Sequence, residues 1–384
     1  MRAISIIIQI LNCKFLISGG NVCTYKKMSL NRGMANGMEL IYLMALTIMF
    51  SFTMETINYP LTQRRLRTDT HIRELTAGFH LSHKSFIQPL FVNEALTEPI
   101  DLVGLNGVQS DTISSVLHTI ENDIQNGIHK FLLFPIPAKK VCKDFDFSFA
   151  TKVVKTIKEK FGDDVWLAID VCLCSYTSHG HCGILNEDHS KLVNNATVTI
   201  LSKYAVELAL AGADCIAPSD MMDGRIAAIR TSLDAFGFDD VSIMSYSAKF
   251  SSQLYGPFRD ACNSTPNSNG IKNRKSYQIS PFNINDAIAS SKRDEEQGAD
   301  ILMVKPAALY TDIIAALKQQ TLKPIAAYHV SGEYASIEAM VQQGFMQREA
   351  AHAEVWTALV RSGANMIISY ASRNAKEWID KIVY

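Results

Sequence analysis

The feature that most constrains the fold is a series of eight short, almost wholly apolar runs, each of which ends in a polar loop. Runs without alternation of polar and apolar residues are typical of parallel strands that are buried on both faces. The segments between the runs have helical periodicity; in residues 111–127, Val116, Ile120 and Ile124 fall on one helical face. The predicted strands are residues 85–92, 130–137, 165–171, 213–220, 241–247, 299–305, 324–331 and 365–370.

Strands that alternate with helices in this way predict an α/β protein, and the number of strands favours a (β/α)8 TIM barrel. An open α/β sheet would use the same local pattern and is the alternative. The junctions agree with the alternation, because a glycine shortly before a strand can end the preceding helix in the left-handed conformation. Such glycines are Gly127, Gly212, Gly298 and Gly363.

The composition narrows the function classes. The chain has 384 residues, of which 47% are hydrophobic and 20% charged, as is ordinary for a globular protein with a large core. The formal net charge of −1 provides no basic field, so nucleic-acid binding is not expected. The eight cysteines do not make a disulfide framework in a chain of this length. We therefore expect a reducing compartment, the cytoplasm, and one local thiolate site.

The N-terminal region differs from the rest. Residues 40–52 are almost purely apolar, but a membrane span needs roughly 20 such residues and no clean signal-peptide cleavage motif follows. We interpret residues 1–53 as a weakly structured extension or a mis-assigned start, and we expect no stable membrane association. Residues 54–84 are polar and basic and read as an N-terminal arm, which usually needs a partner subunit to order it. The barrel is predicted to span residues 85–384.

A loop after the third predicted strand, residues 170–183, is rich in soft metal ligands and reads DVCLCSYTSHGHCG. Cys172 and Cys174 are separated by one residue, too close for an unstrained disulfide, and Cys182 lies eight residues further on. Three thiolates with one open position are typical of catalytic zinc. The alternatives are a structural zinc that a histidine completes, and simple buried thiols.

The same loop contains the residues that such a site needs. Gly180 and Gly183 let the chain fold back so that Cys182 can reach the other two cysteines. His179 and His181 are possible additional ligands, and one of them would be the fourth ligand of a structural zinc.

Two lysines stand at the ends of neighbouring predicted strands. Lys305 follows a largely apolar run, and Lys249 ends the preceding strand, about 5 Å away in a barrel wall. Burial favours the neutral amine, as does a second cation nearby. A neutral amine attacks a ketone or an aldehyde and forms a Schiff base, so both lysines are candidate catalytic groups. The alternative is a strand-end lysine that only pairs with an acidic residue.

A long loop rich in Ser, Asn and Gly follows Lys249 and contains Arg259 and Arg274. Long loops over a barrel mouth often act as lids, and two arginines there suit the capture of a substrate carboxylate. Taken singly, either arginine could equally be a solvated surface charge. Ser331 and Tyr370 end the seventh and eighth predicted strands and add polar groups at the same mouth, where barrel active sites lie.

Five motifs occur in order along the chain and are together very specific. They are DVCLCSYTSHGHCG (170–183), PSDMMDGR (218–225), SYSAKFSSQLYGPFRDA (245–261), LMVKPA (302–307) and YHVSGEY (328–334). With them the chain resembles the porphobilinogen synthases, also called 5-aminolevulinate dehydratases, from about Leu61 to the C-terminus. The resemblance implies a (β/α)8 barrel whose N-terminal arm embraces a neighbouring subunit in a homo-octamer. It also implies the condensation of two 5-aminolevulinate molecules to porphobilinogen, with loss of two waters, in tetrapyrrole (haem) biosynthesis.

The resemblance implies roles for the lysines and the cysteines. Lys305 matches the lysine that forms the principal Schiff base with the first substrate, and Lys249 matches the one that can form the second. Cys172, Cys174 and Cys182 match the cysteines that hold a catalytic zinc ion, which helps to bind and activate the second substrate. Because all three cysteines are present, the chain resembles the zinc-dependent members.

The resemblance also implies how the substrate carboxylates are held. Arg259 and Arg274 match lid positions that bind one carboxylate, and Ser331 and Tyr370 match positions that bind the other. Many bacterial members have an allosteric magnesium site with a glutamate where this chain has Ser290. Allosteric magnesium is therefore doubtful.

Two other functions are compatible with parts of the pattern. A Schiff-base barrel enzyme of the class I aldolase kind would use the lysines but would not need the cysteine loop or the arginine lid. A non-catalytic metal-binding barrel would keep the fold, but it gives no reason for lysines, thiols and arginines to occur together. Dependence on zinc would separate the first alternative from the porphobilinogen synthase hypothesis.

Overall fold

The computed structural model of the chain describes residues 63–267 and 270–382. The chain divides into two units after Arg65, and only residues 63–65 of the first unit are described. The predicted extension, residues 1–53, lies outside the described residues together with its apolar run. In the described part, no helix is both long enough and apolar enough to cross a membrane.

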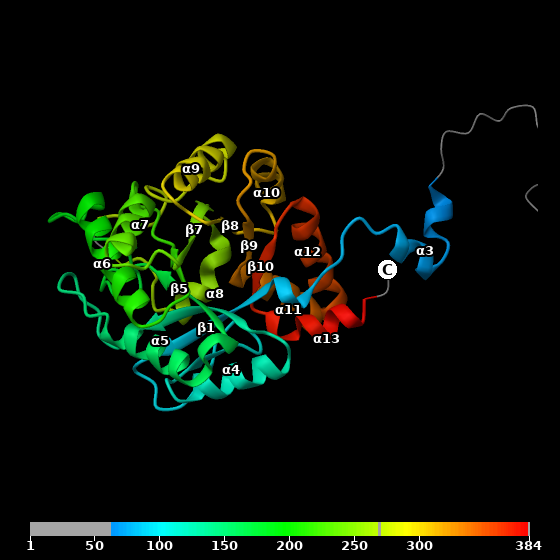
Figure 1. Ribbon diagram of the computed structural model, residues 1–384, viewed down its shortest axis with the longest axis horizontal. Coiled ribbons are helices and arrows are strands. Elements are labelled where there is room, and N and C mark those ends of the chain that lie inside the picture. The colour runs from blue at the N-terminus through cyan, green and yellow to red at the C-terminus, as the bar shows by residue number, and fades with distance from the viewer. Residues whose placement is uncertain (1–62, 268–269, 383–384) are drawn as a thin grey trace, which may run out of the picture. The chain divides into compact units, whose positions relative to one another are not determined.

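The core of the second unit is a closed barrel of parallel strands, at the positions that the sequence predicts (Figure 1). The first and last barrel strands pair with each other, with Phe86 opposite Ile367 and Ile87 opposite Ile368. This pairing closes the sheet, so the open-sheet alternative is wrong. The barrel strands are β1 (Phe86–Asn93), β4 (Lys130–Ile136), β5 (Trp166–Val171), β6 (Cys215–Pro218), β7 (Ser242–Lys249), β8 (Ile301–Lys305), β9 (Ile325–His329) and β10 (Met366–Ser369). Two short strands, β2 (Ile100–Asp101) and β3 (Gln109–Asp111), extend the sheet beside β1.

The apolar runs form these strands because both of their faces are covered. In β4, every residue after Lys130 is buried, and β1 is buried from Phe86 to Val92. Parallel strands covered on both faces need apolar side chains at successive positions, which explains the absence of alternation in the sequence.

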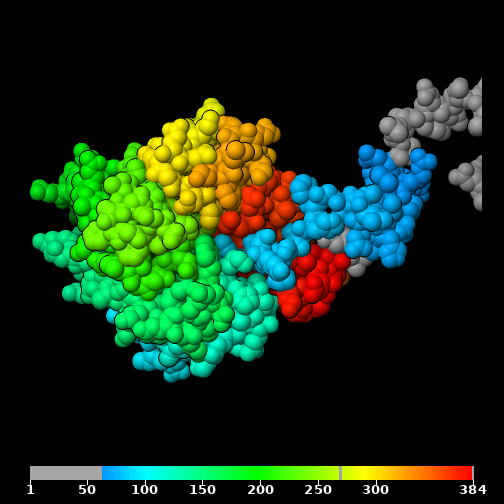
Figure 2. All heavy atoms as spheres, viewed as in Figure 1, coloured from blue at the N-terminus to red at the C-terminus, as the bar shows by residue number. Residues whose placement is uncertain are grey.

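Helices alternate with the strands and cover the outside of the barrel. Neighbouring helices contact one another around it, with α9 beside α10 and α10 beside α12 (Figures 1 and 2). The longer helices are α4 (Ser115–Gln125), α5 (Ser148–Phe161), α6 (Asn194–Leu210), α7 (Arg225–Ala235), α9 (Ile284–Glu296), α10 (Thr311–Lys318), α11 (Ser331–Gln342) and α12 (Arg348–Ser362). Short helices are α3 (Thr70–Leu75), α8 (Gly256–Ala261) and α13 (Ala375–Asp380).

One strand boundary differs from the sequence prediction, and the predicted arm contains a helix. The seventh barrel strand, β9, ends at His329, so Ser331 is the first residue of α11 and not the end of a strand. In the predicted arm, the described part contains α3, and none of the residues 63–85 is buried. The barrel therefore owes its core to residues from Phe86 onward.

The four glycines at the helix–strand junctions have the predicted left-handed conformation. Their φ angles are 83° at Gly127, 101° at Gly212 and Gly298, and 118° at Gly363. At Gly363, which caps α12, an added Cβ would also lie only 2.8 Å from the side chain of Lys318.

The substitution Gly363→Ala is expected to lower the free energy of unfolding by about 1–2 kcal/mol, because an L-residue is strained at this φ angle. Urea unfolding followed by circular dichroism measures the change. The matched control is Gly78→Ala, where φ is ordinary and nothing lies within 4 Å of an added Cβ. Equal stabilities of the two variants would show that the capping conformation does not contribute.

Candidate active site

Lys249 and Lys305 are directly opposite each other at the ends of β7 and β8, as the sequence predicts. Their Cα atoms are register partners in the parallel pairing of the two strands. Both side chains are buried, with 5% and 4% of their surface exposed. The two Nζ atoms lie 5.2 and 4.9 Å from the centre of the Tyr246 ring, so both amines approach one aromatic side chain.

The amine of Lys305 is enclosed by aromatic rings. Its Nζ lies 4.0 Å from the ring centre of Tyr328, 4.9 Å from that of Phe258 and 5.6 Å from that of Tyr255. Burial, and after it the charge of Lys249, lowers the pKa of Lys305 from its ordinary value of 10.5 to about 7. A large fraction of Lys305 is therefore a neutral, nucleophilic amine near neutral pH.

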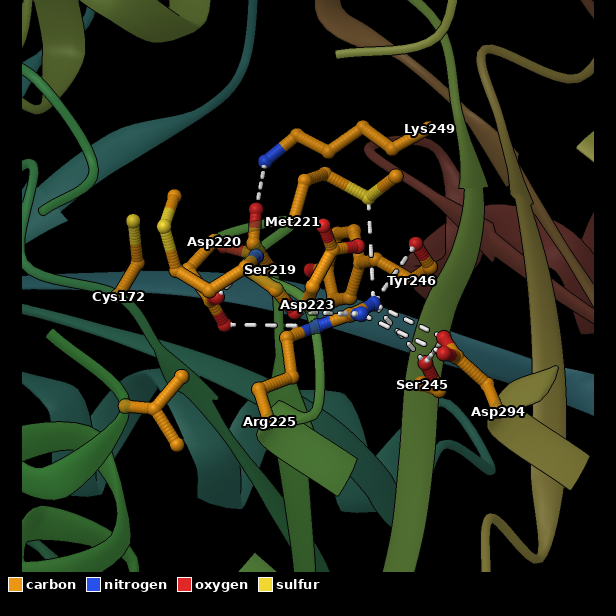
Figure 3. A network of polar contacts seen from close by, with 12 residues as sticks. Cys172, Ser219, Asp220, Met221, Asp223, Arg225, Ser245, Tyr246, Lys249 and Asp294 are labelled. Carbon is orange, nitrogen blue, oxygen red and sulfur yellow. Dashed lines mark hydrogen bonds and ion pairs between the residues drawn. The ribbon is translucent and has the colours of Figure 1, made fainter. Parts of the chain in front are cut away.

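The amine of Lys249 has a different partner. Its Nζ donates a hydrogen bond to the carbonyl oxygen of Ser219, which directly follows β6 (Figure 3). Asp170, near the end of β5, has an enclosed Oδ1 without a hydrogen-bond partner in the described part of the chain. Burial raises the pKa of Asp170 to about 6, although the positive charge of Lys249 opposes the shift.

The three cysteines of the predicted metal site come together. The sulfurs of Cys172, Cys174 and Cys182 lie within 4.8 Å of one another, and all three residues are buried. Burial raises the pKa of the Cys172 thiol, whereas hydrogen bonds from Cys172 and Cys174 lower the pKa of Cys182. The donor set is soft, buried and able to carry negative charge, which fits zinc.

Glycines allow the loop to close, as predicted. Gly180 has a φ of 72°, and an added Cβ would lie 2.6 Å from the carbonyl oxygen of Thr265. At Gly183 an added Cβ would lie 2.6 Å from Oγ1 of Thr197. Side chains at these two positions would therefore push the loop away from its neighbours, and with it Cys182.

The histidines of the loop are engaged elsewhere. The ring nitrogens of His181 lie 3.0 Å from the hydroxyl of Tyr277 and 3.0 Å from the carbonyl oxygen of Ile271. Nδ1 of His179 accepts a hydrogen bond from the backbone N–H of His181. Among the described residues, no histidine or carboxylate joins the cluster of three sulfurs. The cluster in the described part of the chain therefore consists of three thiols alone.

The two arginines of the predicted lid lie in the segment between β7 and α9. Nη2 of Arg274 donates to the carbonyl oxygens of Gly180, at 2.9 Å, and Ser264, at 2.7 Å, which joins the lid to the cysteine loop. Nη2 of Arg259 donates to the carbonyl oxygen of Ser252 at 3.1 Å. In both arginines Nε is enclosed and has no partner within the described residues. Burial, and then the positive charge of Arg274, lowers the pKa of Arg259.

Ser331 and Tyr370 follow adjacent strands, β9 and β10, but the structure gives no direct contact between them. The hydroxyl of Ser331 accepts a hydrogen bond from the backbone N–H of Phe258 at 3.1 Å and lies 3.3 Å from the carbonyl oxygen of Leu254. Ser331 thus holds the lid against α11. The hydroxyl of Tyr370 lies 3.3 Å from that of Tyr328, the ring nearest to the Lys305 amine.

Sequence reasoning left several residues out of the site. Asp170, Ser219 and Tyr246 all lie beside the lysines but were not among the predicted site residues. The available signal was position: Asp170 and Ser219 stand at the C-terminal ends of β5 and β6, where barrel active sites lie. Phe258 comes from the lid, and nothing in its local sequence indicates that it contacts Lys305.

Comparisons with known proteins indicate one family for the chain. The family model described as delta-aminolevulinic acid dehydratase matches residues 61–378. A delta-aminolevulinic acid dehydratase of Bacillus subtilis is 38% identical over 320 residues, which are 82% of this chain and 97% of the relative. One of Chlamydia pneumoniae is 42% identical over 316 residues, 80% of this chain and 93% of the relative.

A solved structure is also similar. The delta-aminolevulinic acid dehydratase (porphobilinogen synthase) of Toxoplasma gondii, in complex with its reaction product porphobilinogen, superimposes with a TM-score of 0.80. The sequences are 36% identical, and the match covers 84% of this chain and 92% of the other. On this evidence the chain belongs to the delta-aminolevulinic acid dehydratase family, the porphobilinogen synthases.

Proposed function

We propose that this protein condenses two molecules of 5-aminolevulinate to porphobilinogen, with loss of two waters, in tetrapyrrole biosynthesis. Membership of the family and the likeness to a relative that binds porphobilinogen support this reaction. The observation that carries the proposal is the buried lysine pair, in which Lys305 has a pKa of about 7 and faces Lys249 across adjacent strands.

Lys305 is the proposed principal nucleophile. Its neutral amine attacks the keto carbon of the first substrate, and loss of water from the adduct leaves a Schiff base on Nζ. The aromatic rings around Nζ line the space in which this Schiff base would form and keep it apart from water. Asp170 has a pKa of about 6, which suits it to exchange a proton at the mouth. In this scheme Lys249 supplies positive charge and is the candidate for a second Schiff base.

The substrate carboxylates are proposed to bind at two places. Arg259 and Arg274 offer enclosed Nε–H groups that have no partner in the described chain, and these suit one carboxylate. Ser331 and Tyr370 are proposed to hold the other carboxylate beside the lid. For Ser331 this requires its hydroxyl to exchange the backbone groups of Phe258 and Leu254 for the substrate.

We propose that Cys172, Cys174 and Cys182 hold a catalytic zinc ion. The fit rests on three buried sulfurs within 4.8 Å of one another and on the absence of a fourth protein ligand among the described residues. When bound, zinc would supply a Lewis acid that polarises a substrate oxygen. Allosteric magnesium stays doubtful, because Ser290 offers a hydroxyl that accepts a hydrogen bond from Arg293.

Assembly through the arm is also proposed. In the described part of the arm, Leu66, Leu75 and Phe79 have 44%, 81% and 47% of their surface exposed. Burial of these side chains against a second copy of the chain would be favourable, as expected for an arm in a homo-octamer. A cytoplasmic location stays a prediction.

The two alternative functions leave features unexplained. A reaction of the class I aldolase kind uses a lysine nucleophile but gives no role to the three thiols or to Arg274, which joins the lid to the cysteine loop. A non-catalytic metal-binding barrel gives no reason to bury two amines next to each other, which costs free energy.

Replacing Lys305 by Met is expected to abolish product formation, by about a thousandfold or more, because the nucleophile is lost while the apolar stem is kept. Porphobilinogen formed from 5-aminolevulinate is quantified by chromatography against an authentic standard. The control is Lys292→Met, at an exposed position of α9, which should leave the rate unchanged. Product formation by a folded Lys305→Met variant at more than a few per cent of the wild-type rate would refute the role of Lys305.

Replacing Cys172 by Ser is expected to reduce bound zinc from roughly one ion per chain to a small fraction, because a hydroxyl is a poor zinc ligand. Metal content by mass spectrometry and porphobilinogen formation are measured together. Turnover should fall in parallel, while the first Schiff base on Lys305 still forms. Cys142→Ser is the control, because Cys142 is exposed and does not belong to the cluster. Unchanged zinc content in Cys172→Ser would contradict the assignment.

A further inference from the structure

A fully buried network of charges lies beside Lys249, and the proposed chemistry gives it no role (Figure 3). At its centre is Arg225, the first residue of α7, whose side chain is not exposed at all. Its Nη2 lies 3.0 Å from Oδ2 of Asp294, and its Nε lies 3.6 Å from Oδ2 of Asp220. Both carboxylates are also fully buried, so one arginine is shared by two enclosed acids.

The guanidinium group of Arg225 joins three separate elements. Nη1 donates to the carbonyl oxygen of Met222, at 3.3 Å, in the turn before α7. Nη2 donates to the hydroxyl of Ser245, at 3.2 Å, in β7, the strand that ends in Lys249. The Ser245 hydroxyl in turn donates to Asp294 of α9 at 2.6 Å. The turn, the strand of one lysine and the helix that leads to the strand of the other are thus fixed relative to one another.

The turn between β6 and α7 has a shape that needs such support. Met221 has a φ of 71°, in the left-handed region that is unusual for a residue other than glycine. The carboxylate of Asp220 accepts a hydrogen bond from the backbone N–H of Met222 at 2.7 Å, and the backbone N–H of Ser219 donates to the carbonyl oxygen of Val171 at 3.0 Å. These bonds direct the carbonyl oxygen of Ser219 toward Nζ of Lys249.

The result is an asymmetry between the two lysines. Nζ of Lys249 donates a hydrogen bond to the carbonyl oxygen of Ser219, which holds this amine in one position. In residues 63–267 and 270–382, Nζ of Lys305 makes no hydrogen bond and is faced by aromatic rings instead.

We propose that Arg225, together with Asp220 and Asp294, is a positioning residue that makes the two lysines unequal. It fixes the carbonyl of Ser219, this carbonyl holds Nζ of Lys249 by a hydrogen bond, and Lys305 is left as the amine that reacts first. This inference rests on the proposed function only for its effect on turnover, since the asymmetry itself requires no substrate.

The test measures the reactivity of each lysine with formaldehyde and cyanoborohydride. The amine attacks formaldehyde, water leaves, and hydride from cyanoborohydride reduces the resulting iminium to a methylamine. Peptide mass spectrometry after a short reaction gives the ratio of methylated Lys249 to methylated Lys305. In the wild-type protein Lys305 should react faster than Lys249.

The informative variant is Arg225→Lys, which keeps the positive charge between the carboxylates but cannot reach all of the acceptors. The Lys249 to Lys305 ratio should rise by about fivefold or more, because the Ser219 carbonyl no longer holds Lys249. Turnover of 5-aminolevulinate should fall by about tenfold or more, because Lys249 is displaced. The KM should stay within about threefold of the wild-type value, because Arg225 does not touch the substrate.

Arg373→Lys is the matched control. Arg373 forms a partly buried ion pair with Asp123, in which Nε lies 3.3 Å from Oδ1, and it has no contact with the lysine pair. Its replacement should leave the labelling ratio unchanged even if stability falls. If Arg225→Lys does not fold, Ser245→Ala replaces it as the test variant. This substitution removes only the hydroxyl between Arg225 and Asp294, and it should raise the Lys249 to Lys305 labelling ratio by about twofold.

An unchanged labelling ratio in folded Arg225→Lys, or in Ser245→Ala where Arg225→Lys fails to fold, would overturn the inference. So would an equal change of the ratio in Arg373→Lys. Because the labelling uses no substrate, failure of the wild-type protein to form porphobilinogen would reject the proposed function and leave this result standing.

Discussion

The site depends on the placement of two buried amines side by side. The register of β7 and β8 brings Lys249 and Lys305 opposite each other, at the points where both strands reach the barrel mouth. Burial disfavours the charged form of Lys305, and the neighbouring charge of Lys249 acts in the same direction. The barrel thus brings the pKa of an ordinarily protonated side chain close to neutral pH.

Negative charges near the lysines offset part of their mutual repulsion. Asp170 offsets part of the positive charge at the mouth, and Cys182, whose pKa hydrogen bonds from Cys172 and Cys174 lower, brings further negative charge when its thiol ionises. Arg225 is enclosed between two acids, and removal of one member of such a buried ion group typically costs about 3–5 kcal/mol. A well-packed apolar core would serve stability equally well, so the network is best explained by the geometry that it imposes on the turn next to Lys249.

The barrel and most of the site could be predicted from the sequence, because both follow from local patterns. Buried parallel strands require uninterrupted apolar runs, and the groups at their ends converge when the sheet closes, as Lys249 and Lys305 do. The spacing of Cys172, Cys174 and Cys182, with Gly180 before Cys182 and Gly183 after it, was enough to indicate that the three sulfurs meet. The left-handed glycines before four strands were likewise a local signal.

What could not be predicted depends on contacts between distant elements. Arg225 lies in a motif of the sequence, but its role needs Asp294, which is 69 residues further along the chain. Ser331 was assigned to a strand end, whereas it begins α11 and holds the lid through Phe258. The histidines of the cysteine loop looked like ligands, yet Tyr277 and the carbonyl of Ile271 engage His181. Local sequence does not contain these three-dimensional partners.

We infer that Lys305 is a neutral nucleophile because of where the barrel places it. The most direct measurement is the pH dependence of its first Schiff base with 5-aminolevulinate, formed briefly at each pH, quenched with borohydride and located by peptide mass spectrometry. The rate of adduct formation at Lys305 should rise with pH and reach half of its maximum near pH 7, because the pKa of Lys305 is about 7. A midpoint near pH 10, as for an unperturbed lysine, or an adduct that forms elsewhere and not on Lys305, would contradict this account.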